Sequence, residues 1–439
     1  MSRTPAFDIK IFEKRRARIG KSIKDSAIVL FSQPEFVRNN DVHHRHRQDS
    51  NLFYLTGFEE AESVFVYRPG LKPETILFVR PKDEFRETWD GFRFGPEGAK
   101  KYYKVDEAHL ISSLEEKLPE FLKDVKQVYY SLKENPEHDK VFLKAIKKTQ
   151  STFHRGSRGN LPILDSKELL GEFRLIKDET EIEWQRQACE ITAKAHIETM
   201  KFVKPGINER QIEGFLQFQF KNQLAAREGY ESIVASGKNA TTLHYIFNDQ
   251  KCKAGDLLLI DAGAEFNYFS GDITRTFPVN GKFTKIQKEF YNHVLEVQKK
   301  ILATIKPGIE FKSMQEKTIE LLTEAMIDLK LLKGKKEKLI KDLAYKKYYM
   351  HGVSHWLGMD VHDAGLYEID KKSRKLEANM VFTVEPGLYV PYNDESAPKD
   401  LRGLGVRIED NILVTKKGYE NLTQKAPKEV SDIEKVMSS

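Results

Sequence analysis

The stretch Asp256-Leu-Leu-Leu-Ile-Asp261-Ala-Gly-Ala-Glu-Phe-Asn-Tyr-Phe-Ser-Gly-Asp272-Ile-Thr-Arg-Thr-Phe277 predicts two β-strands joined by a tight turn near Phe266-Asn267. A turn centred there places Asp261 directly opposite Asp272, with Cβ atoms about 5 Å apart. Two like charges this close destabilise a hairpin, and Asp261 follows four apolar residues, where a solvated carboxylate is not expected. A divalent cation between the carboxylates would remove both problems. The alternative is a pair of aspartates in turns at strand ends.

Two later segments also carry carboxylates in apolar strands. Met380-Val-Phe-Thr-Val-Glu385-Pro-Gly ends an apolar run with a glutamate. In Val406-Arg-Ile-Glu-Asp-Asn-Ile412, alternation puts Arg407, Glu409 and Asn411 on one strand face. The four carboxylates together match the charge of two divalent cations. Oxygen ligands with an imidazole suit manganese, cobalt or zinc better than a thiophilic metal site.

The imidazole is expected in the segment from His351 to Asp363, which holds His351, His355 and His362 out of 12 histidines in the chain. A single histidine is more often structural than a ligand, but the glycines and the small serine of this segment suggest backbone packed against a site. His244, in Thr241-Thr-Leu-His-Tyr245, is a weaker candidate. The run Val42-His-His-Arg-His-Arg47 reads as a solvated loop, because its arginines repel cations.

Composition places the chain among ordinary globular proteins. It has 439 residues, 40% hydrophobic and 31% charged, enough for two or three domains. The net charge of +6 gives little reason to expect nucleic acid or acidic lipid as a partner. Two cysteines exclude a disulfide framework, and no apolar run approaches a membrane span or signal-peptide core. We therefore expect a cytoplasmic protein with no membrane partner. Phosphate-loop, His-Glu-x-x-His and Gly-x-Ser-x-Gly motifs are absent from the sequence.

The pattern of apolar runs predicts two parts. The first is a compact α/β unit with strands at 27–31, 63–67 and 75–79, helices around 106–124 and 137–149, and a loop at 155–162. Helices at about 178–202 and 208–228 open the second part. Val203-Lys-Pro-Gly-Ile207 recurs as Ile305-Lys-Pro-Gly-Ile309, each followed by an amphipathic helix. This favours a duplicated unit with pseudo-two-fold symmetry, although Pro-Gly also stops helices without any duplication.

The order Asp261, Asp272, His355, Glu385 and Glu409 closely resembles that of the pita-bread metallopeptidases, and the flanking sequence is most similar to the aminopeptidase P (Xaa-Pro aminopeptidase) family. Matching segments begin at Arg47, Ile260, Gly271, Met350, Thr383 and Gly405, so the resemblance covers essentially the whole chain. It implies an α+β protein: a smaller α/β amino-terminal domain at 1–174 and a pita-bread catalytic domain with pseudo-two-fold symmetry at 175–439.

The resemblance also implies a reaction: a hydroxide bridging two divalent metal ions attacks the N-terminal Xaa-Pro bond of a peptide. Manganese is expected, with zinc or cobalt possible. Asp272 and Glu409 would bridge the ions, Asp261 would complete one, and His355 with Glu385 the other. The implied catalytic residues are His244, His362, Glu385 and Arg407, and the implied walls of the proline pocket are Tyr230, His351, Val361 and Tyr389. Homodimers or homotetramers are implied as well, with Trp89 reaching a neighbouring subunit.

Other functions remain open from the sequence. A prolidase confined to dipeptides would need a cap on the site, which the sequence does not reveal. A metal-free peptide- or protein-binding module and a metal-free, creatinase-like hydrolase are disfavoured, because such proteins lose ligands and all five are present here. An Xaa-Pro bond has no N–H, so a site built on metals and ring-packing side chains suits it.

Overall fold

The structure, a computed structural model, describes residues 4–151 and 161–439. The loop predicted at 155–162 lies outside them except for its last two residues. The chain divides into two compact units, Met1–Phe173 and Arg174–Ser439. The boundary predicted from the sequence, between residues 174 and 175, differs by one position. Each unit is described by itself.

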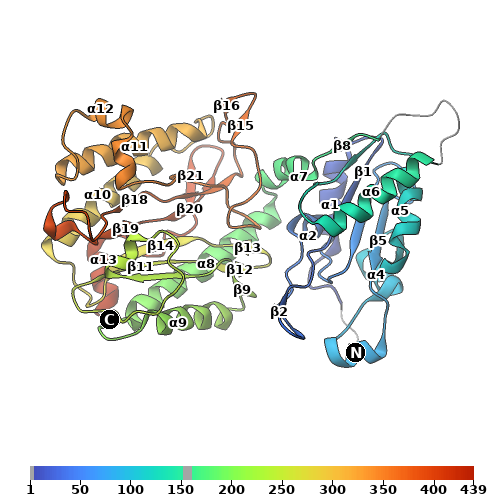
Figure 1. The fold of residues 1–439 in the computed structure, drawn as a ribbon, viewed down its shortest axis with the longest axis horizontal. Coiled ribbons are helices and arrows are strands. Elements are labelled where there is room, and N and C mark those ends of the chain that lie inside the picture. Colours follow the sequence, from blue (N-terminus) through green and yellow to red (C-terminus); the bar gives the residue numbers. More distant parts are fainter. Residues whose placement is uncertain (1–3, 152–160) are drawn as a thin grey trace. The chain divides into compact units, whose positions relative to one another are not determined.

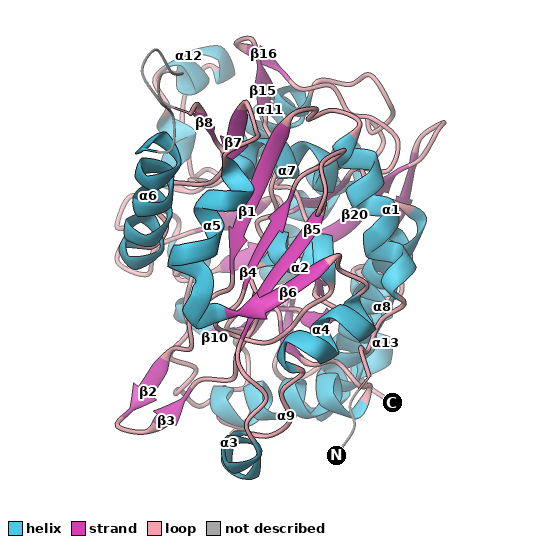
Figure 2. Cartoon of the chain, turned by 90° about the vertical axis from the view of Figure 1, so that its right-hand side faces the viewer, coloured by secondary structure: helices cyan, strands magenta, loops and turns pink. Residues whose placement is uncertain are grey.

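The first unit is built on a six-stranded mixed sheet in the order β6-β5-β4-β1-β7-β8 (Figure 2). Its strands are β1 (Ser26–Phe31), β4 (Val64–Tyr67), β5 (Thr75–Val79), β6 (Glu107–Leu110), β7 (Gln127–Tyr129) and β8 (Ile163–Leu164). β1 is parallel to β7 and antiparallel to β4. A separate exposed hairpin consists of β2 (Val37–Asn39) and β3 (Val42–His43), so the first two residues of the solvated loop predicted at 42–47 form a short strand.

Helices cover both faces of this sheet, as the burial of nearly every residue of β1, β4 and β5 requires. The helices of this part of the chain are α1 (Ile9–Gly20), α2 (Ser50–Thr56), α3 (Glu84–Asp90), α4 (Gly95–Tyr103), α5 (Leu114–Leu122), α6 (Pro136–Ser151) and α7 (Ser166–Leu175); α3 has no buried residue and covers neither face, and α7 runs past the end of the unit. The alternate residues Ala27 and Val29 face the core closed by α5 and α6. Figure 1 shows α1 and α2 on the other side of β1. The helix predicted at 106–124 is wrong at its start: residues 107–110 form β6 beside β5.

The second unit places small antiparallel sheets between two helix pairs (Figure 1). Its helices are α8 (Glu179–Phe202), α9 (Glu209–Asn222), α10 (Lys285–Leu302), α11 (Phe311–Asp328), α12 (Lys336–Lys341) and α13 (Val430–Met437). Its strands are β9 (Arg227–Glu228), β10 (Ile233–Ser236), β11 (Leu257–Ala262), β12 (Ala264–Phe266), β13 (Phe269–Ser270), β14 (Ile273–Pro278), β15 (Glu368–Ile369), β16 (Lys372–Ser373), β17 (Val381–Val384), β18 (Gly387–Tyr389), β19 (Gly405–Arg407), β20 (Asp410–Val414) and β21 (Tyr419–Asn421). The helix predicted at 208–228 ends six residues early, at Asn222.

The repeated Lys-Pro-Gly sequence corresponds to a repeated structure. Gly206 and Gly308 have positive φ angles of 91° and 89°, which glycine adopts without strain. Their backbone amides donate to the carbonyl oxygens of Cys252 and Leu376, each at 2.8 Å. Matching β-bridges follow in the two halves, Asn208 with Lys251 and Glu310 with Lys375. Each turn therefore joins an equivalent helix pair, α8–α9 and α10–α11, and the predicted pseudo-two-fold fold is confirmed.

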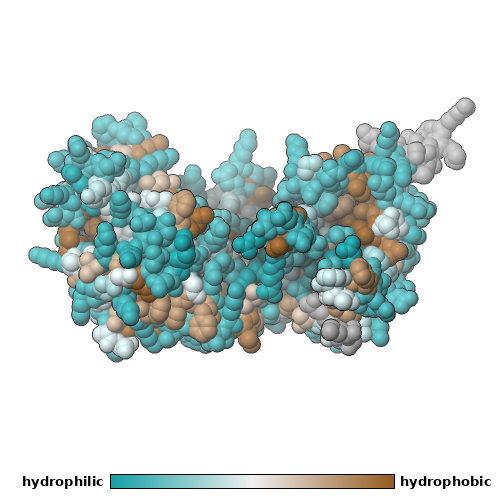
Figure 3. Space-filling model, turned by 60° about the horizontal axis from the view of Figure 1, so that its bottom comes forward, coloured by the Kyte–Doolittle hydropathy of each residue, from teal (hydrophilic) through white to brown (hydrophobic). Residues whose placement is uncertain are grey.

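One large core fills the second unit between its helices and sheets and draws on both halves. The face drawn in Figure 3 is mostly hydrophilic, with apolar residues scattered in small groups, as is usual for globular proteins. Of the helices described, none combines the length and the apolar character needed to cross a bilayer.

Candidate metal centre

The first strand pair forms as predicted, but its register differs. In the β11–β14 ladder Asp261 lies opposite Thr274, not opposite Asp272. The two-residue turn consists of Asn267 and Tyr268, both with positive φ (50° and 71°), so its centre is one residue later than predicted. This moves each partner by two positions, which preserves the strand face. Asp261 and Asp272 are therefore diagonal neighbours rather than direct partners.

Tyr230 connects these two aspartates. Its hydroxyl lies 2.6 Å from Asp261 Oδ1 and 2.5 Å from Asp272 Oδ1. Burial, together with the two carboxylates, raises the pKa of Tyr230 well above its usual value, so the phenol keeps its proton. The two aspartate side chains thus converge on one point at the end of the hairpin.

His355 faces the same point from the second half of the unit. Its Nε2 lies 3.3 Å from Asp272 Oδ2 and 3.6 Å from Glu385 Oε1. Nδ1 is 3.0 Å from the carbonyl oxygen of Trp356, which suits an Nδ1–H donor and directs the Nε2 lone pair to the carboxylates. Burial alone would lower the pKa of His355, but the hydrogen bond and charge of Asp272 and the charge of Glu385 raise it to about 9. The neighbouring carboxylates therefore favour a positive charge at Nε2, either a proton or a metal ion.

Glu385 and Glu409, like the two aspartates, are buried close to other carboxylates. Burial and the neighbouring Asp272 and Asp261 raise the pKa of Glu385 to about 7, against the opposing effect of His355 and Arg407. Burial and the other carboxylates also raise the pKa of Glu409 well above its usual value. Buried carboxylates in this state take up protons or a metal ion. Asp272, His355 and Glu409 each offer a ligand atom within 4.8 Å of the others. The donors present therefore fit divalent cations.

Arg407 ties the carboxylates to the residues behind them. Its NH2 donates to Asp261 Oδ2 at 2.5 Å, its Nε to the hydroxyl of Thr274 at 3.1 Å, and its NH1 to the hydroxyl of Tyr389 at 3.1 Å. The Tyr389 hydroxyl lies 2.8 Å from His351 Nε2, whose Nδ1 is 2.7 Å from the carbonyl oxygen of Gly352. Burial and the charge of Arg407 lower the pKa of His351 to about 4, so the ring is neutral and accepts from Tyr389.

Two contributors were not assigned a role from the sequence. The hydroxyl of Thr274 donates to Glu409 Oε2 at 2.6 Å. The side-chain oxygen of Asn411 accepts from the amide of Asp272 at 2.9 Å, and its nitrogen donates to the Asp272 carbonyl. Alternation gave a signal for both, because Thr274 follows Asp272 by two positions and Asn411 was placed on the face of Glu409. Thr274 thus orients the carboxylate of Glu409, and Asn411 holds the backbone from which the Asp272 side chain extends.

The four carboxylates, His355 and Arg407 line a cavity of about 610 Å³. Its lining residues are Tyr230, Glu231, Leu243, His244, Ile246, Asp261, Asp272, His351, Gly352, Ser354, His355, Val361, His362, Glu385, Arg407 and Glu409. All the site residues predicted from the sequence are among them except Tyr389, which lies behind the wall in a small apolar cluster. Glu231, Leu243 and Ile246 were not predicted. The rings of His362 and His355 meet edge to face, with centroids 4.4 Å apart.

Comparisons with known proteins agree with this geometry. Residues 183–416 match metallopeptidase family M24, and residues 12–129 match the aminopeptidase P N-terminal domain. The chain is 43% identical to the Xaa-Pro aminopeptidase of Haemophilus influenzae, over 97% of each protein. It resembles the solved structure of Pseudomonas aeruginosa aminopeptidase PepP (TM-score 0.95, 40% identity, 99% of each chain). It also resembles zinc-substituted Escherichia coli aminopeptidase P in complex with product (TM-score 0.94, 37% identity, 98% of each chain).

Proposed function

Because the chain belongs to metallopeptidase family M24, as an aminopeptidase P, we propose that it hydrolyses the N-terminal Xaa-Pro bond of peptides at a centre of two divalent cations. The observation that carries this is the convergence of Asp272, His355 and Glu409 in one buried cluster. Asp272 and Glu409 would bridge the ions, Asp261 would complete one, and His355 with Glu385 the other. We propose manganese as the resident metal, since oxygen ligands dominate, with zinc or cobalt as alternatives.

Bound cations would supply a hydroxide at neutral pH and polarise the scissile carbonyl. The protein's own side chains transfer the proton and hold the metal ligands in place. Glu385 takes the proton released at the nucleophile and passes it to the leaving proline nitrogen. Arg407 holds Asp261 in its ligating orientation through the bond to Oδ2. Arg407 is itself fixed by its buried hydrogen bonds to Asp261, Thr274 and Tyr389.

The other cavity residues bind the peptide. His244 and His362 would stabilise the negative oxygen of the tetrahedral intermediate or steady the substrate. Burial and the charge of His355 lower the pKa of His362, so its ring is neutral at physiological pH and has one N–H to donate. Tyr230, His351 and Val361 form the walls against which the proline ring packs, and Tyr389 supports His351 from behind.

The cavity suits a substrate without an amide proton. The Xaa-Pro bond cannot donate a hydrogen bond from its nitrogen, so recognition must come from the ring and the carbonyl.

A prolidase acting only on dipeptides is the second candidate. The experiment that separates them compares hydrolysis of Xaa-Pro-Xaa tripeptides with Xaa-Pro dipeptides, with and without added manganese. Cleavage of dipeptides alone would show that the protein is a prolidase. Hydrolysis by verified metal-free protein would contradict both functions.

We also propose a homodimer or homotetramer. On α3, Phe85 and Trp89 are 71% and 74% exposed, and Trp89 is the residue that would reach a neighbouring subunit. Light scattering that reports only monomer at micromolar concentration would contradict this.

Both cysteines are free and buried, in keeping with a reducing compartment, so we retain the cytoplasm as the proposed location. Fractionation of cells expressing the protein would test it.

A further inference from the structure

Glu209 is a buried carboxylate that the proposed reaction does not use. It is the first residue of α9 and is fully buried. Its Oε1 accepts from the backbone amide and the hydroxyl of Ser236, both at 2.7 Å, and from the side-chain amide of Asn239 at 3.1 Å. Its Oε2 accepts from the hydroxyl of Tyr245 and the backbone amide of Gln250, both at 2.9 Å. One carboxylate thus holds a single segment, residues 236–250, at four places.

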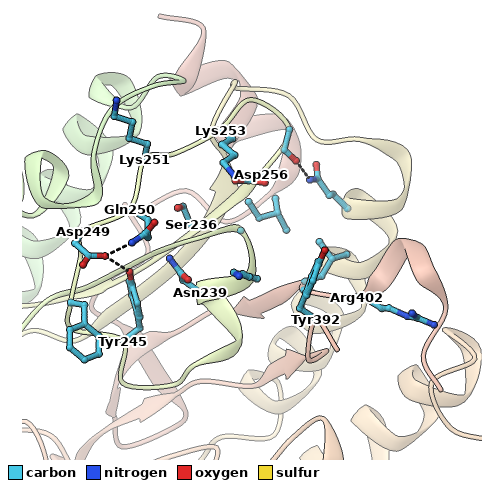
Figure 4. Close-up of a pocket in the computed structure, with 18 residues that line it drawn as sticks. Ser236, Asn239, Tyr245, Asp249, Gln250, Lys251, Lys253, Asp256, Tyr392 and Arg402 are labelled. Atoms are coloured by element: carbon cyan, nitrogen blue, oxygen red, sulfur yellow. Dashed lines mark hydrogen bonds between the residues drawn. The ribbon is translucent and has the colours of Figure 1, made fainter. Parts of the chain in front are cut away.

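That segment forms the wall between two cavities. Leu243, His244 and Ile246 line the cavity of the metal centre. Tyr245 and Phe247 instead line a second cavity of about 730 Å³, shown in Figure 4, where Ser236, Asn239, Tyr245 and Gln250 lie around the same side. The donors of Glu209 therefore sit on the face of the segment opposite to His244.

The position of His244 depends on the backbone of this segment. Within the described residues its ring has no hydrogen-bond partner, and its side chain is exposed. Glu209, in contrast, is stabilised by five donors and by the positive end of the α9 dipole. A buried carboxylate is costly to leave unpaired, so it holds its donors, and with them the segment, in one arrangement.

The pseudo-symmetric partner of Glu209 occupies an equivalent place in the second half. Phe311 is the first residue of α11, after the second Lys-Pro-Gly turn. Its ring packs on Trp356, Tyr367 and Phe382, with centroids 4.4, 5.1 and 5.9 Å apart. Trp356 directly follows His355. The same helix start thus supports a histidine segment in each half, by hydrogen bonds in one and by aromatic packing in the other.

We propose that Glu209 is a positioning residue for peptide hydrolysis, which sets the place of His244 in the metal-centre cavity through the segment 236–250. This rests on the proposed role of His244 in the reaction. Glu209 touches no substrate, and it acts by keeping the histidine where the developing negative charge arises. Misplacing a catalytic group by about 1 Å costs up to 10²-fold in rate.

The test uses Glu209→Gln, which preserves size but turns one acceptor oxygen into a donor that faces other donors. Tyr245→Phe, which removes one donor from the segment, is the milder variant if the first folds poorly. Thr318→Val is the matched control. Thr318 is equally buried, its hydroxyl donates within α11 to the carbonyl of Met314 at 2.8 Å, and it lies outside the cavity lining. Metal content, kcat, KM and amide hydrogen exchange of residues 237–250 are measured on the metal-loaded, full-length protein.

We expect Glu209→Gln to keep wild-type metal content, to lower kcat about 10- to 10²-fold with a smaller change in KM, and to speed exchange in the segment. In a His244→Ala background the same substitution should have almost no further effect on kcat, because both act through one side chain. Additive losses, or wild-type kcat in Glu209→Gln, overturn the proposal. If His244→Ala alone has wild-type kcat, the assigned role of His244 fails. In that case unchanged exchange in Glu209→Gln shows that the segment is not held by Glu209 either.

Discussion

Arg407→Lys keeps the positive charge beside Asp261 and removes the forked geometry of the guanidinium. Three separate nitrogens of Arg407 donate to Asp261, Thr274 and Tyr389. A lysine ammonium sits at the end of one flexible stem, so it can keep the contact with Asp261 but not the other two. Each bond lost from a charged donor is worth about 1.5–3 kcal/mol, and water entering the space offsets part of that.

Only part of this lost hydrogen-bond energy reduces the stabilisation of the transition state. The support of Asp261 and, through Tyr389, of His351 is loosened, while the ligands themselves stay. Residues that support metal ligands typically account for 10–10² in metal affinity or activity. We therefore expect kcat/KM for an Xaa-Pro-Xaa tripeptide to fall about 10- to 10²-fold, equal to about 1.4–2.7 kcal/mol of transition-state stabilisation.

The assay measures kcat, KM, metal content and the thermal midpoint on one preparation. Arg402→Lys is the matched control. The Arg402 guanidinium likewise donates through separate nitrogens, to the carbonyl oxygens of Ala397 (3.0 Å) and Glu395 (2.8 Å), but it lies outside the metal-centre cavity. Wild-type kcat/KM in Arg407→Lys would refute the reasoning. So would an equal loss in Arg402→Lys, because the effect would then be one of general stability.

Exhaustive chelation should abolish activity and a divalent metal should restore it; full turnover in verified metal-free protein would rule out the metal mechanism. Asp272→Ala should lose more metal than Asp261→Ala, because in its proposed bridging role Asp272 holds both ions, and two ions retained in Asp272→Ala would contradict that ranking. His362→Ala should lower kcat about 10²- to 10³-fold with metal content unchanged; near-normal kcat or a lost ion would show a different role. Burial lowers the pKa of His196 from 6.5 to about 4, so the unfolded chain takes up a proton first as the pH falls. His196 therefore lowers the free energy of unfolding as the pH falls from 6.5 towards 4, by about 3 kcal/mol at most, and has no such effect above pH 6.5. Denaturant titrations at both pH values should show a smaller loss in His196→Gln.

The carboxylates of the cavity were predictable because they interrupt or end apolar strands, whereas Tyr230 and Val361 were expected only from the family resemblance. Asp261 follows four buried residues of β11, and Glu385 follows β17, so the face that each occupies is dictated by burial. The register was wrong because the choice between a turn at Phe266-Asn267 and one at Asn267-Tyr268 depends on a positive φ at a tyrosine. No residue preference indicates that conformation for tyrosine.

Glu209 and Tyr389 show what the sequence could not reveal. A glutamate in the first turn of a helix ordinarily faces solvent, and the donors of Glu209 are 27 to 41 residues away in the chain. Tyr389 follows the Pro-Gly pair in β18 and was expected to face the substrate. Its ring instead packs in a cluster with Ile233, Leu259 and others, contributed by strands of the first half. Both placements depend on tertiary packing rather than on any local period.

The five carboxylate and imidazole donors are spread from residue 261 to residue 409 of a 439-residue chain, two in one half of the duplicated unit and three in the other. During synthesis the first two aspartates are made well before the residues that complete the site. Until Glu409 has been made, the growing chain holds only part of this donor set. A complete set of the proposed donors therefore exists only once residues from both halves of the unit have been made and brought together. The ion that fills the proposed centre would then depend on which divalent cation is available when the two halves come together, as well as on the affinities of the site.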